Sequence, residues 1–438
     1  MNEKSILNPP TSRREFLRTS SSAALGGMVA ANLTIAPKSS AADGDTLKIG
    51  LVGCGGRGSG AASQALRADK NVVLTAMADA FSDALHRSLN TLKSQFPDKV
   101  KVEPDQCFVG LDAYQKVIAS GVDVVLLATP PGFRPLHFKT AVDAGKHIFC
   151  EKPMATDVPG IRAVMAAAEE AKKKKLAVVA GFCWRYDSAR RELFKRIHGG
   201  AIGDLRALYH TYYTGPVKPM PPANKRPAGM GDVEWQVRNW YNFSWLSGDG
   251  YVEQAVHSVD KLAWATKDLP PLRCTAVGGR QIPNNEGNIF DHIEVNYEFA
   301  NGVRGFVVHR QITNCYGENR DYIMGTKGIA NIGGRRRPVE ITGEASWSYE
   351  GPTPPDMYQV EHNELFASIR SGNPINDGAW MCQSTLLGIM GRLAAYTGQE
   401  ITWEQAVKSQ EKLVPDNLDW NMSLPITPIP MPGRTKSA

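Results

Sequence analysis

A glycine-rich turn constrains the fold of this 438-residue chain more than any other feature. The residues Gly53-Cys54-Gly55-Gly56-Arg57-Gly58 follow an apolar strand expected at 47–52, and they open a helix. In such a G-x-G-x-x-G turn, the first glycine permits the tight turn, the second lets the backbone approach a pyrophosphate, and the third lets helix and strand pack closely. The free N–H groups at the helix start attract phosphate. The pattern therefore predicts a dinucleotide-binding βαβ unit.

An acidic residue lies at the distance at which this fold binds ribose. Asp79 ends the second expected strand, at 72–78, and stands 21 residues beyond Gly58. A carboxylate here accepts hydrogen bonds from the ribose hydroxyls and repels a 2′-phosphate, and Ala80 and Phe81 supply no arginine to bind one. We therefore expect NAD as the cofactor, in preference to NADP.

Two patterns of secondary structure divide the chain. Strands and helices alternate up to about residue 182, which predicts a doubly wound parallel sheet covered on both faces. After residue 184 long β-rich stretches predominate, and Asn301-Gly302 joins two of them in an expected hairpin. The fold class is therefore α/β, with a Rossmann domain at 43–183 and an α+β domain with an open mixed or antiparallel sheet at 184–438. The expected strands of the first part are 47–52, 72–78, 122–129, 147–150 and 176–182, and its expected helices are 59–68, 82–94, 135–144 and 159–175. Two further helices are expected at 360–370 and 382–396.

Composition excludes several classes of protein. The formal net charge is only +6, and the longest basic run, Lys172–Lys175, ends an expected helix, so we expect no nucleic-acid partner. The seven cysteines include no C-x-x-C pair, so we expect no metal site and mostly buried, reduced thiols.

The first 42 residues read as an export signal. The run Ser12-Arg13-Arg14-Glu15-Phe16-Leu17-Arg18 resembles the twin-arginine motif. A weakly apolar stretch follows at 23–36, and small residues at 40–42 offer a cleavage site. We expect recognition by the twin-arginine export machinery and a periplasmic or otherwise exported protein.

Further landmarks carry a resemblance to a known family. In order along the chain they are Ala128-Thr129-Pro130, Ala144-Gly145-Lys146-His147, Glu151-Lys152-Pro153, Trp184-Arg185-Tyr186 and His257-x-x-Asp260. With the glycine turn, they make residues 46–406 similar to the Gfo/Idh/MocA family, which includes glucose–fructose oxidoreductase and inositol dehydrogenase. The resemblance implies a Rossmann domain followed by an α+β domain whose open sheet often forms homo-oligomers. It also implies that the cofactor contacts the carboxyl ends of the parallel strands, at Thr129, Pro130, Glu151 and Lys152, with His137 nearby.

The resemblance also implies a catalytic set. Lys152 would lie beside the nicotinamide ring and the reacting hydroxyl, where an ammonium opposes negative charge on oxygen. His257 would be the general base. On one continuous helix, Glu253, His257 and Asp260 would project at 0°, about 40° and about −20°, so that a carboxylate could orient the imidazole. Inositol dehydrogenases usually have Asp where this chain has Glu253, which leaves an inositol-like substrate in doubt.

Candidate substrate-binding groups are less distinctive. Arg185, Tyr186, Arg238 and Asn239 are candidate hydroxyl-binding groups, and Trp240 and His257 complete the candidate substrate site. None of these residues has a spacing that discriminates among sugars. Trp235, Trp240 and Trp245 lie shortly before His257 and are either a platform for a sugar ring or part of the core.

Three functions follow from these observations. The first is an NAD(P)-dependent oxidoreductase acting on a sugar, sugar acid or cyclitol, with a tightly bound cofactor because the exported protein has no NAD pool around it. The second is an NAD-dependent glycoside hydrolase or lyase that oxidises a ring hydroxyl transiently. The third is a binding protein with NAD as a structural element.

Overall fold

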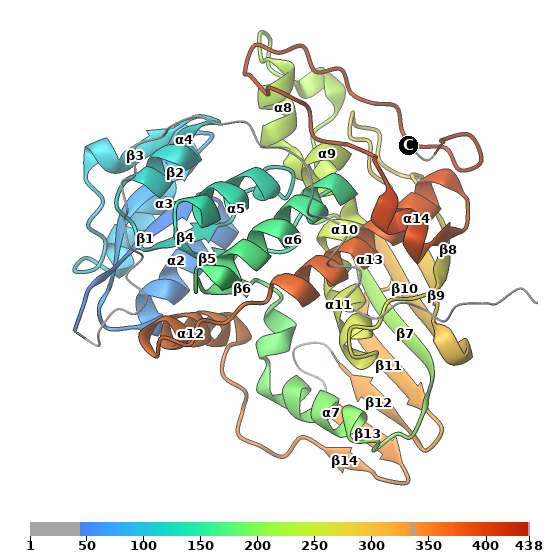
Figure 1. Cartoon of the computed structure of the whole chain (residues 1–438). Coiled ribbons are helices and arrows are strands. Elements are labelled where there is room, and N and C mark those ends of the chain that lie inside the picture. Colours follow the sequence, from blue (N-terminus) through green and yellow to red (C-terminus); the bar gives the residue numbers. More distant parts are fainter. Residues whose placement is uncertain (1–43, 334–337, 437–438) are drawn as a thin grey trace, which may run out of the picture. The chain divides into compact units, whose positions relative to one another are not determined.

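Two β-sheets organise the chain, and helices pack on both of them (Figure 1). The computed structural model describes residues 44–333 and 338–436. The expected signal peptide at 1–42 lies outside the described residues. No helix in the described ranges is long and apolar enough to cross a membrane.

The first sheet has six parallel strands in the order β3-β2-β1-β4-β5-β6. The strand order reverses between β1 and β4, which leaves a crevice at their carboxyl ends, where doubly wound sheets bind ligands. The strands are β1 (Leu47–Val52), β2 (Val72–Asp79), β3 (Cys107–Val109), β4 (Val124–Leu127), β5 (His147–Cys150) and β6 (Val178–Ala180). The Rossmann fold predicted from the sequence is confirmed.

The strands of this sheet are apolar on both faces because helices cover both. Leu127 packs into a core with α4, α5 and α6, whereas the adjacent Leu126 packs into a second core with α2 and α3. Consecutive residues of a strand point to opposite faces, which explains the continuous apolar runs in the sequence. The helices are α2 (Gly56–Ala68), α3 (Ser82–Gln95), α4 (Ala113–Ala119), α5 (Arg134–Asp143) and α6 (Val158–Lys173).

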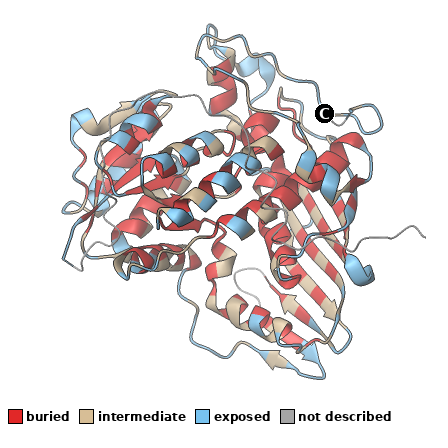
Figure 2. Ribbon diagram, in the orientation of Figure 1, coloured by how far each residue is buried: buried red, intermediate tan, exposed pale blue. Residues whose placement is uncertain are grey.

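A helix from much later in the chain completes the second of these cores. Leu365, Phe366 and Ile369 of α12 (Met357–Arg370) are buried together with Leu89 of α3 and Leu51 of β1. Figure 2 shows the buried positions, in red, on the helices that flank the sheet. The chain therefore returns to the first sheet after it has formed the second, and the domain boundary expected at 183/184 stays a prediction.

The second sheet has nine strands, and it is mixed as expected. Its order is β14-β13-β12-β11-β7-β10-β9-β8-β15; β7 and β10 pair in parallel, and the other neighbours are antiparallel. The expected hairpin joins β9 and β10, with positive φ at Asn301 and Gly302. The strands are β7 (Leu205–Thr214), β8 (Arg273–Gly279), β9 (His292–Glu298), β10 (Arg304–Gln311), β11 (Glu318–Gly325), β12 (Gly328–Ile332), β13 (Val339–Gly343), β14 (Trp347–Ser348) and β15 (Ile401–Thr402).

Helices α7, α11 and α13 share a core with the second sheet. The helices of this part are α7 (Ser188–His198), α8 (Asp232–Arg238), α9 (Ser244–Ser247), α10 (Gly250–Glu253), α11 (Val256–Ala265), α13 (Gly378–Thr397) and α14 (Trp403–Lys408). All seven cysteines are free, and five of them are buried, as expected.

The prediction that one continuous helix carries Glu253, His257 and Asp260 is wrong. Helix α10 ends at Glu253, and α11 begins at Val256. In an unbroken helix the Glu253 carbonyl would accept the N–H of His257. Here that carbonyl accepts a hydrogen bond from Lys152 Nζ at 2.5 Å, and the His257 N–H donates to the Gln254 carbonyl instead. A contact with a residue 101 positions away therefore accompanies the break.

Candidate active site

A cleft of about 470 Å³ lies at the carboxyl ends of β1, β2 and β4. Most of the residues predicted to bind a cofactor line it, namely Gly53, Gly55, Gly56, Arg57, Gly58, Asp79, Thr129, Pro130 and His137. Three predicted residues, Cys54, Glu151 and Lys152, are not part of the lining.

The glycine loop has the geometry that a pyrophosphate requires. Gly53 has a φ of +95°, and a Cβ on Gly58 would lie 1.8 Å from the Gly53 carbonyl oxygen. These two positions need glycine for reasons of backbone conformation and packing. A Cβ on Gly55 or Gly56, in contrast, would meet no atom within 4 Å. These two residues leave open space at the start of α2, which has no side-chain cap and no acidic residue in its first turn. The loop therefore fits a dinucleotide.

Asp79 is held rigidly beside this loop. Its Oδ2 accepts the Cys54 N–H at 2.6 Å, and its Oδ1 accepts the Phe81 N–H at 2.9 Å. Burial raises the pKa of the Asp79 carboxyl, and these backbone donors act in the opposite direction. Cys54 contributes through its backbone, because its Sγ is buried against the Ala78 carbonyl. The carboxylate thus lies where a ribose bound along the loop would meet it.

The wall near β4 is built around a buried, neutral histidine. His137 stacks on Tyr114 with ring centroids 4.0 Å apart, and its Nδ1 lies 3.2 Å from Thr129 Oγ1. Burial lowers the pKa of His137 to about 3, so the ring is uncharged at neutral pH. The buried guanidinium of Arg134 donates to the backbone carbonyls of Thr129 and Pro153. Arg134, which sequence reasoning missed, therefore ties together the loops that follow β4 and β5.

Glu151 is an anchor for the glycine loop. Its Oε1 accepts from Arg57 Nε at 2.5 Å, and only 7% of its side chain is exposed. The same arginine lies 4.0 Å from the buried Glu361 carboxyl and 4.7 Å above the Tyr358 ring, both on α12. Arg57 therefore connects the cleft, the end of β5 and the returning helix.

The structure joins Lys152 to Glu253 and places His257 within electrostatic reach of Lys152. Lys152 Nζ lies 2.8 Å from Glu253 Oε1, in addition to its bond to the Glu253 carbonyl. His257 is buried, with Phe182 and Trp184 edge-on at 6.3 Å and 6.5 Å. Burial, assisted by the charges of Lys152 and Lys261, holds the pKa of His257 well below its usual value. A neutral imidazole beside an ammonium is the result.

Asp260 pairs with an arginine and does not orient the imidazole of His257. Its Oδ1 accepts from Arg185 Nε at 2.9 Å and from Ser384 Oγ at 2.7 Å. Arg185 also pairs with Asp268 at 2.6 Å and lies 4.1 Å over the Trp380 ring. Asp260 and Arg185 thus form a buried ion pair, and the His257 Nδ1 is left without a hydrogen-bond partner among the described residues.

The remaining candidates divide between core and cleft. Tyr186 is buried and donates to Asp377 at 2.7 Å, so it is a core residue. Trp235 and Trp245 are also buried. Trp240 lines the cleft, and so does Lys218, whose Nζ lies 5.6 Å from the Trp240 ring. Sequence reasoning missed Lys218, because only the fold brings it to the glycine loop. No cluster of metal ligands occurs among the described residues.

The fold and this cleft define a dinucleotide-dependent enzyme of the Rossmann type. Residues 47–180 match a family described as an oxidoreductase family with an NAD-binding Rossmann fold. Inositol 2-dehydrogenase of Gluconacetobacter diazotrophicus is 30% identical over 342 residues, which are 76% of this chain and 89% of that protein. The chain belongs to the Gfo/Idh/MocA family of oxidoreductases, and its cofactor is NAD.

Solved structures show the same fold. Aldose-aldose oxidoreductase from Caulobacter crescentus, complexed with glycerol, has a TM-score of 0.64 at 20% identity, with 82% of this chain and 99% of that chain covered. Levoglucosan dehydrogenase in complex with NADH and levoglucosan has the same TM-score, identity and coverage.

Proposed function

We propose that this protein is a dehydrogenase that oxidises a CH–OH group of a sugar, sugar acid or cyclitol. The observation that carries the proposal is the neutral, buried His257 within electrostatic reach of Lys152, which is paired with Glu253. The names of similar proteins support the substrate class, since they include an inositol 2-dehydrogenase and a levoglucosan dehydrogenase.

Residues of the cleft would hold the cofactor. The N–H groups at the start of α2 face the open space in front of Gly55 and Gly56, and they would bind the pyrophosphate. Asp79 would accept the ribose hydroxyls. When bound, NAD supplies the acceptor for the hydride that leaves the substrate carbon.

His257 is proposed to receive the hydroxyl proton. Its lowered pKa keeps the imidazole uncharged at neutral pH, and only the uncharged ring can accept a proton. Lys152 faces the charge that develops on the substrate oxygen as that proton departs, and its ammonium stabilises this charge. Glu253 positions Lys152 through two acceptors, its backbone carbonyl and its carboxylate. Asp260, bound to Arg185, positions α11 and does not itself contact the imidazole.

The test is a reaction with candidate sugars, cyclitols, sugar acids and aryl glycosides in heavy water. A dehydrogenase forms a ketone or lactone together with NADH, or passes the hydride to a second substrate. A glycoside hydrolase returns the hydride to the same sugar, releases the aglycone, and leaves deuterium at the carbon next to the oxidised one. Release of the aglycone with such labelling, and no net change in the cofactor, would overturn the proposal.

Export is part of the proposal. The twin-arginine motif supports transport of a folded, cofactor-loaded protein to the periplasm or beyond. An exported enzyme without a surrounding NAD pool needs a cofactor that it retains. Arg13→Lys with Arg14→Lys should leave the protein in the cytoplasm, folded and loaded, as measured by cell fractionation. Normal export of this variant would remove the twin-arginine route.

A further inference from the structure

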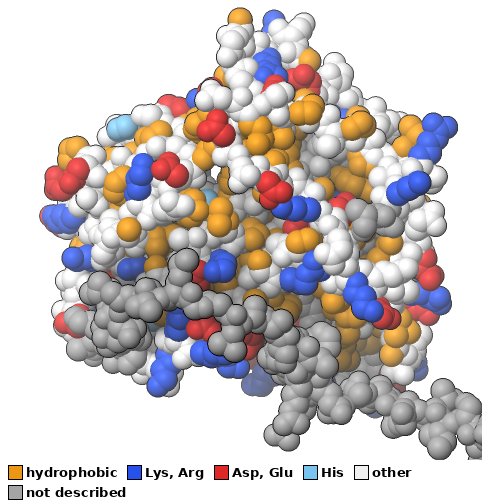
Figure 3. Space-filling view, turned by 45° about the horizontal axis from the view of Figure 1, so that its top comes forward, with side chains coloured by type: hydrophobic (Ala, Val, Ile, Leu, Met, Phe, Trp, Pro, Cys, Tyr) orange, Lys and Arg blue, Asp and Glu red, His pale blue; other side chains and the backbone are white. Residues whose placement is uncertain are grey.

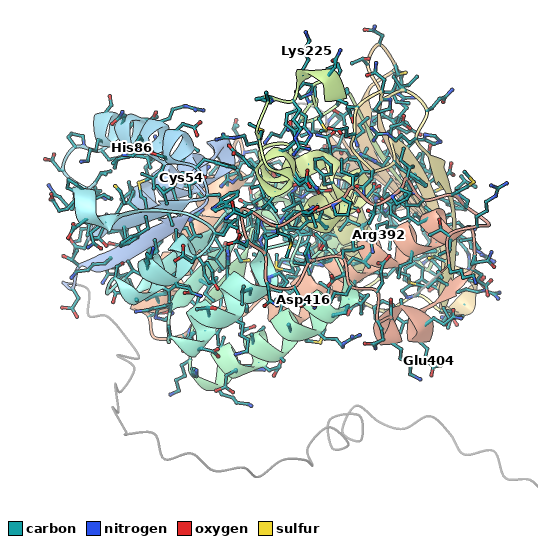
Figure 4. The ribbon with its side chains drawn as sticks, turned by 90° about the horizontal axis from the view of Figure 1, so that it is seen from above. Cys54, His86, Lys225, Arg392, Glu404 and Asp416 are labelled. Atoms are coloured by element: carbon teal, nitrogen blue, oxygen red, sulfur yellow. The ribbon has the colours of Figure 1, made fainter. Side chains whose placement is uncertain are left out.

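Two segments outside the Rossmann sheet lie over one end of the dinucleotide cleft. The first, here called the roof, is residues 215–246, which include α8 and α9. The second, here called the tail, is residues 411–436, drawn in dark red beside α8 in Figure 1. Figure 4 gives the view from above, with Cys54 marking the glycine loop and Lys225 marking the first part of the roof.

The roof contributes directly to the lining of the cleft. Lys218, Val237, Arg238 and Trp240 line it together with the glycine loop. The opposite wall at this end comes from Phe81, after β2, and from the loop after β3. Because Asp79 ends β2 and the catalytic lysine follows β5, this is the adenosine end of the cleft. The roof therefore lies where the adenosine half of a dinucleotide would be.

Arg238 and Lys218 add charge at this end. The Arg238 guanidinium lies 3.8 Å over the Phe81 ring, and its Nη1 lies 3.5 Å from Asp83 of α3. Both contacts join the roof to the Rossmann domain. Lys218 is half-buried; burial lowers its pKa, and the nearby Asp79 carboxylate acts in the opposite direction. The ribose site thus has an ammonium as well as a carboxylate within electrostatic reach.

The tail fastens the roof to the Rossmann domain. Leu424 donates its N–H to Asp232 at 3.0 Å and accepts from Gln236 Nε2 at 2.7 Å, both on α8. Trp420 packs on Phe81 with ring centroids 5.6 Å apart. The members of one apolar cluster come from all three parts: Phe81, Leu111 and Phe133 of the Rossmann domain, Val233, Trp235 and Trp245 of the roof, and Leu413, Trp420 and Met422 of the tail. Figure 3 shows apolar side chains, in orange, grouped on this upper face.

We propose that the roof, held down by the tail, binds the adenosine end of the cofactor through Lys218, Arg238 and Trp240, and that its closure retains the cofactor. The inference deepens the proposed function and depends on NAD being the ligand of the cleft. A dinucleotide in the cleft would lie between the glycine loop and the roof. Its release would require the Phe81–Trp420 and Phe81–Arg238 contacts to open. Cofactor exchange is then limited by this opening and not by the strength of the pyrophosphate contacts alone.

In the test, the full-length protein is loaded with NADH and mixed with excess NAD. The fluorescence of NADH then measures the rate at which NADH is released. Trp420→Ala and Arg238→Gln should each release NADH at least about tenfold faster than the unchanged protein. Ile429→Ala is the matched control, because Ile429 belongs to the same tail but is 46% exposed and lies outside the apolar cluster. It should release NADH at the unchanged rate.

A second measurement isolates the adenosine end. ADP-ribose lacks the nicotinamide ring, so Lys218→Ala should weaken its binding about tenfold, as calorimetry would detect. Lys152→Ala should leave ADP-ribose binding unchanged, because Lys152 is not part of the cleft lining. Thermal unfolding of each variant without cofactor verifies that the variant is folded. If Trp420→Ala does not fold, Arg238→Gln alone tests the release of NADH.

The outcomes separate the two proposals. If the unchanged protein binds neither NADH nor ADP-ribose, the proposed function fails. If it binds both, but the roof and tail variants release NADH as slowly as the Ile429→Ala control, the roof does not retain the cofactor and this inference is wrong.

Discussion

At the glycine loop, Cys54 and Asp79 meet across 25 positions of the chain, within one βαβ unit. At the proposed catalytic end, Lys152 and Glu253 meet across 101 positions. Lys152 follows β5 of the first sheet, and Glu253 ends α10, in the part of the chain that forms the second sheet. The first geometry follows from strand, turn and helix in immediate succession. The second exists only after both sheets have packed together. Substitutions should therefore act differently at the two ends.

The largest effect is expected at His257. His257→Ala should lower kcat about 10²–10⁴-fold, equivalent to about 3–5 kcal/mol of activation free energy, because general-base catalysis is lost. NADH affinity should change little, since His257 is not part of the cleft lining. Steady-state kinetics and NADH titration measure both quantities. An unchanged kcat would remove His257 from the mechanism.

Two glycine substitutions test the adenosine end. Gly58→Ala should destabilise the cofactor-free protein by about 3 kcal/mol or more, because the new Cβ would collide with the Gly53 carbonyl. Gly55→Ala should leave that stability almost unchanged, since its Cβ meets no protein atom, yet it should weaken NADH binding strongly. Thermal unfolding and NADH fluorescence distinguish them. Unchanged NADH binding by Gly55→Ala would contradict the assignment of Gly55 to the pyrophosphate.

Two carboxylates of the proposed catalytic end, Asp260 and Glu253, should differ in whether their loss lowers stability or kcat. Asp260→Asn should reduce stability by about 2–3 kcal/mol, because Arg185 loses a buried partner. Glu253→Gln should mainly reduce kcat, by about tenfold, because it loosens Lys152. Denaturant unfolding and kcat measured on both variants provide the comparison. A greater loss of kcat in Asp260→Asn than in Glu253→Gln would restore Asp260 as the direct support of the base.

An effect that depends on pH concerns Glu361, the buried carboxyl under Arg57. Burial, and then the charge of Glu151, raises its pKa well above the usual value, and the charge of Arg57 acts in the opposite direction. As pH rises above the unfolded value of about 4.3, only the unfolded chain loses this proton, and stability falls by up to about 1.4 kcal/mol per pH unit.

Glu361→Gln removes this dependence. Relative to the unchanged protein, the variant should gain stability progressively between pH 5 and pH 7, by up to about 1.4 kcal/mol per pH unit, and it should gain nothing below about pH 4. Thermal unfolding over this pH range measures the difference. Parallel stability curves for the two proteins would mean that Glu361 ionises normally.

The same contrast explains which features sequence reasoning could predict. The glycine loop, Asp79 and the hairpin at Asn301-Gly302 depend on backbone conformations that neighbouring residues set, and all three lie where expected. The helical wheel through Glu253 and His257 failed, because the break in that helix involves a bond to the distant Lys152.

Long-range contacts also explain the residues that were missed. Arg134 links loops after two different strands, and Lys218 reaches the glycine loop from the roof. No spacing in the chain signals either contact. Arg185 and Tyr186 were expected to face a substrate, but ion-pair and hydrogen-bond partners from elsewhere in the chain hold them inside.

The return of α12 to the first sheet has a consequence for synthesis of the chain. A ribosome delivers residues 47–180 long before residues 357–370, so the Rossmann core emerges with one helical layer incomplete. Until α12 arrives, the apolar surface of α2 and β5 stays open, and Arg57 lacks its contacts with Tyr358 and Glu361. Arg57, which is bound to Glu151, therefore acquires its full set of contacts only when most of the chain has been translated.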